Sequence, residues 1–166
     1  MATQLTAEDA RQSLTAHVEA KGVEVFLKYG VQFDWAALPA LLADRAFVRY
    51  PCEIAFDEAQ LLPGELAHPV QKGESPEEGF TMFVHPALAG QMERVAAVVL
   101  YQLVVVNYGE FASLEEAETF GAAALGLTRD EYYAKLCALA DQIGGAVEPG
   151  LMEAPPVGCG GGCSCG

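Results

Sequence analysis

The chain has 166 residues, 52% hydrophobic and 19% charged, with 9 Lys and Arg against 23 Asp and Glu and a net charge of −14. This length and apolar content predict one domain with a substantial core. The acidic balance disfavours nucleic acid and anionic membranes as partners, because phosphate groups are bound by clustered Lys and Arg.

Nothing in the first residues resembles a secretory signal, since positions 1–9 lack both a basic and an apolar region. The longest apolar run, 95–106, contains Gln102 and spans 12 positions, fewer than the about 20 that cross a bilayer. We therefore expect a cytoplasmic protein. In that reducing environment the five cysteines are expected to be free thiols or metal ligands.

The first third of the chain has a helical pattern. Thr6, followed by acidic residues, predicts an N-cap for a helix over 7–28 that bends at Gly22. A shorter helix is predicted over 35–43, capped by Asp34, although its Pro39 must lie in the first turn or cause a kink.

A small β element is predicted next. Residues 47–56 alternate in polarity and predict a strand, which Pro51 places at a sheet edge or at a bulge. A second strand is predicted over 80–84, pairing antiparallel with the first. The connection between them, 57–79, is dense in turn-forming residues, and a loop of this length usually has a function or is mobile.

The second half of the chain predicts three more helices. Residues 86–109 are apolar on nearly every side, which indicates a central helix, although the β-branched run 104–106 leaves a strand as the alternative. Capping boxes at Ser113 and Thr128 begin helices over 113–126 and 128–143.

The predicted organisation is a single mainly α domain of about five helices with a two-stranded β element, over residues 1–145. After it, residues 146–166 form a flexible tail rich in Gly, Pro and Cys. This tail contains the clearest chemical motif of the chain: Cys159, Cys163 and Cys165 lie among glycines.

Clustered thiols are the ligands that soft metal ions prefer, so Cu(I) and Zn(II) are the predicted cofactors. Three thiolates satisfy Cu(I), whereas structural Zn(II) needs a fourth ligand. We therefore predict an accessory protein that binds or transfers a soft metal ion and docks onto a protein partner. The same motif leaves three alternatives: a thiol redox pair formed by Cys163 and Cys165, a tail that is covalently modified, and an interaction protein whose tail cysteines are incidental.

A second set of residues predicts a different function. His68 lies within the 57–79 region and His85 follows the second predicted strand, and with nearby carboxylates they could form the site of a small metal-dependent or thiol-dependent enzyme. The set is His68, His85, Glu65 and Glu53. The two remaining cysteines, Cys52 and Cys137, lie in apolar patterns and are predicted to pack in the core.

Overall fold

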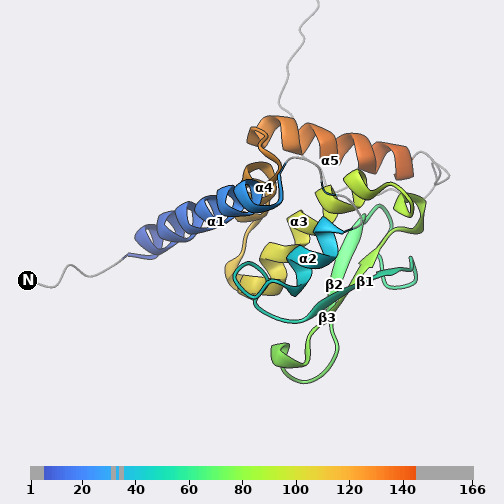
Figure 1. The fold of residues 1–166 in the computed structure, drawn as a ribbon, viewed down its shortest axis with the longest axis horizontal. Coiled ribbons are helices and arrows are strands. Elements are labelled where there is room, and N and C mark those ends of the chain that lie inside the picture. Colours follow the sequence, from blue (N-terminus) through green and yellow to red (C-terminus); the bar gives the residue numbers. More distant parts are fainter. Residues whose placement is uncertain (1–5, 31–32, 34–35, 145–166) are drawn as a thin grey trace, which may run out of the picture.

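The computed structural model describes residues 6–30, 33 and 36–144, which form five α-helices and a three-stranded sheet (Figure 1). This confirms the mainly α fold. The helices are α1 (Ala7–Tyr29), α2 (Ala37–Ala43), α3 (Met92–Tyr108), α4 (Leu114–Leu125) and α5 (Arg129–Gly144), and the strands are β1 (Cys52–Phe56), β2 (Ala67–Gln71) and β3 (Phe80–Val84).

The sheet differs from the prediction in strand number and direction. Its order is β1-β3-β2, and β1 pairs with β3 in parallel, with Ile54 opposite Met82. The predicted antiparallel pairing of these two strands is therefore wrong. The cause is β2, which lies inside the predicted 57–79 loop and pairs antiparallel with β3, so that β3 runs in the same direction as β1.

Pro69 explains why β2 was missed. A proline argues against a strand because it has no N–H to donate, but an edge strand tolerates it. β2 is an edge strand, and Pro69 lies opposite Met82 of the central strand β3.

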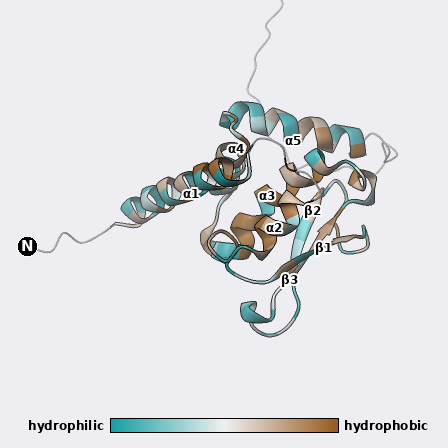
Figure 2. Cartoon of the chain, viewed as in Figure 1, coloured by the Kyte–Doolittle hydropathy of each residue, from teal (hydrophilic) through white to brown (hydrophobic). Residues whose placement is uncertain are grey.

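The central helix is α3. Most of its residues are buried, and it packs against α4 on one side and against β2 and β3 on another. Figure 2 shows α3 as a largely hydrophobic ribbon inside the molecule and α5 as a more hydrophilic ribbon outside it. The helix ends as predicted at Gly109, but it begins at Met92, because residues Pro86–Leu88 form a separate 3-10 turn.

Gly22 is a packing residue of α1, not the predicted bend, since α1 is one helix from Ala7 to Tyr29. A Cβ atom at this position would lie 2.6 Å from the Cβ of Ala123 and 2.7 Å from the carbonyl oxygen of Phe120. The absence of a side chain therefore lets the backbones of α1 and α4 approach closely.

The predicted caps are present where the structure describes them. Thr6, Ser113 and Thr128 open α1, α4 and α5, and each exchanges hydrogen bonds with the acidic residue three positions later. Pro39 lies in the first turn of α2, whereas its predicted cap, Asp34, is outside the described residues.

Candidate functional site

A cavity of about 250 Å³ lies between the start of β2, α3 and α5. Its walls are mainly apolar, with a few polar groups that could orient a ligand. The lining residues include Tyr101 of α3, Glu118 of α4, and Tyr133, Leu136 and Cys137 of α5.

Cys137 is the cysteine that lines this cavity. The side chain is partly exposed and lines the cavity, so the predicted burial in the core is wrong. Tyr133 lies one helical turn earlier on α5 and lines the same cavity. The interaction with the Cys137 side chain raises the pKa of Tyr133, so this phenol keeps its proton at neutral pH.

A second phenol, Tyr101 of α3, lines the same cavity. Burial, and then the nearby carboxylate of Glu118, raise the pKa of Tyr101. Glu118 is itself neutralised by Arg129, whose Nη2 lies 3.0 Å from a Glu118 carboxylate oxygen. The cavity thus offers one thiol and two protonated hydroxyl groups beside a compensated carboxylate.

The structure brings together two of the four predicted loop residues. The Nδ1 atom of His68 lies 3.1 Å from a carboxylate oxygen of Glu65, and Glu65 also lines the cavity. This pair is exposed at the surface, where such a contact contributes little to stability.

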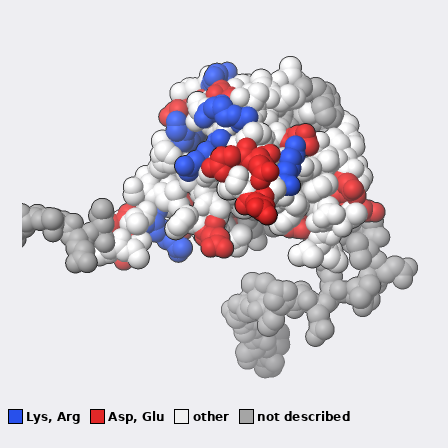
Figure 3. Space-filling view, turned by 90° about the horizontal axis from the view of Figure 1, so that it is seen from below, with Lys and Arg blue, Asp and Glu red and all other residues white. Residues whose placement is uncertain are grey.

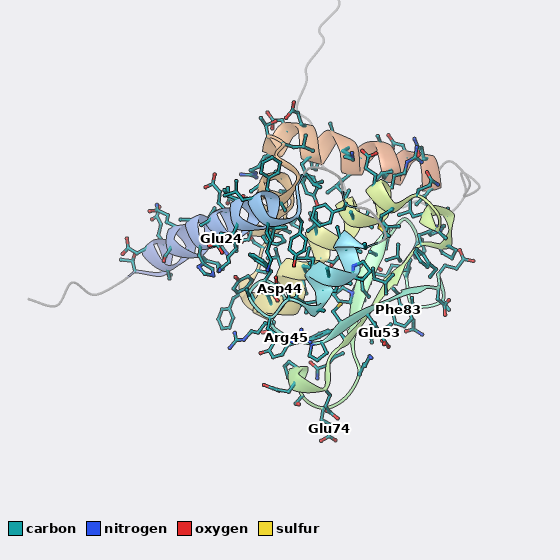
Figure 4. All side chains as sticks on the ribbon, viewed as in Figure 1. Glu24, Asp44, Arg45, Glu53, Glu74 and Phe83 are labelled. Carbon is teal, nitrogen blue, oxygen red and sulfur yellow. The ribbon has the colours of Figure 1, made fainter. Side chains whose placement is uncertain are left out.

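Glu53 and His85 have other partners. Lys72 holds the Glu53 carboxylate at 2.7 Å, and the Nε2 atom of His85 lies 3.6 Å from Glu58. Glu53 is opposite Thr81, four positions before His85 along β3, which corresponds to about 13 Å. Figure 4 shows Glu53 on the sheet.

Within residues 6–30, 33 and 36–144, no three His, Cys, Asp or Glu side chains are placed to hold a metal ion together. Cys52, the other described cysteine, packs partly buried against the core. Burial raises the pKa of this thiol to about 11. It is therefore protonated at neutral pH.

The predicted tail ligands, Cys159, Cys163 and Cys165, lie outside the described residues. Sequence reasoning correctly marked them as the densest group of thiols, but it missed the cavity. The spacing of Tyr133, Leu136, Cys137 and Ala140, which puts them on one face of a helix, was the available indication.

An apolar groove lies at the C-terminal end of α3. It is lined by Tyr50, Phe80, Val105 and Phe111, and Phe111 is 84% exposed. Exposed aromatic side chains beside a groove are typical of protein interaction sites.

No protein-family model, curated protein or solved structure matches this chain. Among the described helices, none combines the length and apolar character needed to span a bilayer.

Proposed function

We propose that this protein binds a soft metal ion through Cys159, Cys163 and Cys165 and passes it to a protein partner in the cytoplasm. The observation that carries the proposal is the presence of three thiols within seven consecutive residues, separated by Gly and Ser. Thiolate sulfur selects Cu(I) and Zn(II) over harder cations. Glycine imposes few backbone restrictions, so a short segment can turn several sulfurs toward one ion.

The number of thiols favours transfer. Three thiolates satisfy a Cu(I) ion, while Zn(II) bound by three retains an open position. A partner can enter such a position and replace the tail thiolates one at a time. Each exchange then breaks one metal–sulfur bond as another forms, so the ion is never released free.

The helical domain would bring the tail to its partner. The groove with Phe111 is apolar, and the chain as a whole carries a net charge of −14. On the face seen in Figure 3, Lys and Arg side chains lie around a central group of acidic ones. A partner with an apolar side chain could occupy the groove, and the net negative charge of the chain would favour a basic partner over an acidic one.

The proposal is tested by titrating the reduced full-length protein with Cu(I) and with Zn(II) in competition with a chromophoric chelator. We expect one high-affinity ion per chain. Replacing Cys159, Cys163 and Cys165 together by Ser should abolish this binding, because serine oxygen is a poor ligand for soft ions.

Cys52→Ser is the matched control, since Cys52 is a protonated thiol on the sheet and should not contribute. Equal binding by the triple variant and the wild-type protein would refute the proposal.

A further inference from the structure

A second cavity, of about 230 Å³, gathers basic side chains from two segments that are distant in the sequence. His17 and Lys21 lie four positions apart on α1, and Arg45 and Arg49 lie in the connection between α2 and β1. No Asp or Glu is among the described residues that line this basic cavity. In a chain with 9 Lys and Arg against 23 Asp and Glu, the basic cavity is a local reversal of charge.

The two arginines of the basic cavity have no carboxylate partner. Among the described residues, no Asp or Glu forms an ion pair with Arg45 or Arg49. Outside the cavity, most of the other Lys and Arg residues do have such a partner: Lys28, Lys72, Arg129 and Lys135. An uncompensated pair of arginines in a strongly acidic chain is what an anion site requires.

The arginines keep hydrogen-bond donors for a ligand. The Nη1 atom of Arg45 donates to the carbonyl oxygen of Val48 at 3.1 Å, and the Arg49 guanidinium lies 5.5 Å from the centroid of the Tyr50 ring. A guanidinium group carries five N–H donors, so most of them remain available on each arginine.

Lys21 and Arg49 act on one point of the cavity, although they come from different segments. Burial raises the pKa of Tyr108, which lines the cavity, and the positive charges of Lys21 and Arg49 both oppose that rise. Lys21 also pairs with Glu24 at 3.0 Å, but this contact is largely exposed and contributes little. The Lys21 ammonium is therefore available to a stronger anion.

A buried amide holds the segment that carries Arg49. The Oδ1 atom of Asn107 accepts a hydrogen bond from the Arg49 N–H at 2.8 Å, and its Nδ2 atom donates to the carbonyl oxygen of Phe47 at 2.7 Å. This backbone is thus ordered before any ligand binds, which lowers the entropic cost of binding.

We propose that the basic cavity binds a phosphate monoester with a small aromatic body. Arg49 and Lys21 would hold the phosphate together with Arg45, because the guanidinium fork matches phosphate oxygens. The aromatic body would lie against Phe47 and Tyr108, whose side chains line the same cavity. This site is separate from the tail, so it does not depend on the proposed metal transfer.

Volume and charge select this class of ligand. The cavity corresponds to the liquid volume of about eight water molecules, which is more than a phosphate group alone would fill. A phosphate monoester carries about −1.5 to −2 charges and three strong acceptor oxygens, so it should bind more tightly than a carboxylate. The net charge of −14 still repels a polyanion, which agrees with the expectation that nucleic acid is a poor partner.

The probe for the test is phenyl phosphate, titrated into the full-length protein by isothermal calorimetry at about 0.15 M salt, where long-range attraction is screened. We expect saturable binding at one site. Inorganic phosphate, which lacks the ring, should bind more weakly, and phenol, which lacks the charge, should not bind at the same concentrations.

Arg49→Gln should weaken phenyl phosphate binding by at least about tenfold, because it removes charge-assisted hydrogen bonds. Arg94→Gln is the matched control, since Arg94 also has no carboxylate partner among the described residues but lies outside the cavity, bonded to Gln142. Its affinity should equal that of the wild-type protein. Circular dichroism would show that both variants are folded.

Glu24→Gln provides a gain that misfolding cannot imitate. It removes the carboxylate that competes for Lys21, so phenyl phosphate should bind about two- to threefold more tightly.

Unchanged affinity in Arg49→Gln, or an equal loss in Arg94→Gln, would overturn the site. Binding of phenol as tight as that of phenyl phosphate would overturn the role of the charge, and equal binding of inorganic phosphate would overturn the role of the ring. Metal binding by the tail should be the same in all these variants, so failure of this inference leaves the proposed function intact.

Discussion

Glu116 connects two helices through a buried carboxylate, and replacing it by Ala should strongly destabilise the protein. The side chain is fully buried at the start of α4. It accepts hydrogen bonds from the Ser113 N–H at 2.9 Å, from the Ser113 hydroxyl, and from the Thr15 hydroxyl of α1 at 2.8 Å. One residue therefore closes the N-terminus of α4 and links it to α1.

The magnitude follows from these contacts. Losing a helix cap costs about 1 kcal/mol and losing a hydrogen bond to a charged group about 1.5–3 kcal/mol, so Glu116→Ala should lower the free energy of unfolding by about 3 kcal/mol. For a domain of this size that is a fall in melting temperature of about 6–12 °C. Urea denaturation followed by circular dichroism would measure it.

Glu131→Ala is the matched control. Glu131 occupies the same position in the capping box of α5, where it bonds to Thr128, but it is exposed and has no contact corresponding to Thr15. Glu131→Ala should lower the free energy of unfolding by well under half of the amount expected for Glu116→Ala. Equal losses at the two positions would refute the argument that the link to α1 matters.

The carboxylate of Glu116 should also make the stability of the protein depend on pH. Burial acts to raise the pKa of Glu116, but the hydrogen bonds from Ser113 and Thr15 outweigh it and the pKa is lowered. Because the pKa of Glu116 is lower in the folded state, its ionised carboxylate stabilises the fold at any pH above its unfolded-state pKa. This contribution is lost as the pH falls through the folded-state pKa. The stability difference between wild type and Glu116→Gln should therefore shrink in acid.

Two further substitutions test packing between the helices. Gly22→Ala should destabilise the protein by about 1–3 kcal/mol in the same denaturation assay, because its new methyl group would collide with Ala123. Gly144→Ala should not, because no atom of the described residues lies within 4 Å of the added Cβ. Thr119→Val should be neutral or stabilising by up to about 1 kcal/mol, because the buried Thr119 hydroxyl has no hydrogen-bond partner among the described residues. A clear loss of stability in Thr119→Val would instead indicate a bond to solvent or to the undescribed part of the chain.

Sequence reasoning succeeded where the cause of a structure is local. Thr6, Ser113 and Thr128 each precede the first residue of a helix, and the apolar character of 92–108 reflects the burial of most of α3. Sequence reasoning failed where contacts between segments distant in the chain determine the structure. Pro69 can lie in a strand only because β3 pairs with its other side, and the use of Gly22 depends on α4, about one hundred residues later.

The candidate site shows the same limit. The tail motif is contiguous, so composition alone identified it. The cavity is assembled from β2, α3, α4 and α5, and its position depends on the strand that was not predicted. Cys137 was assigned to the core because its neighbours on α5 are apolar, yet those neighbours form the cavity wall that keeps the thiol accessible.

The two described cysteines are therefore not equivalent, although both lie in apolar patterns. Burial raises the pKa of the Cys52 thiol to about 11, so forming the thiolate that binds metal ions or attacks electrophiles is costly at this position. Cys137 lines a cavity together with the phenols of Tyr101 and Tyr133.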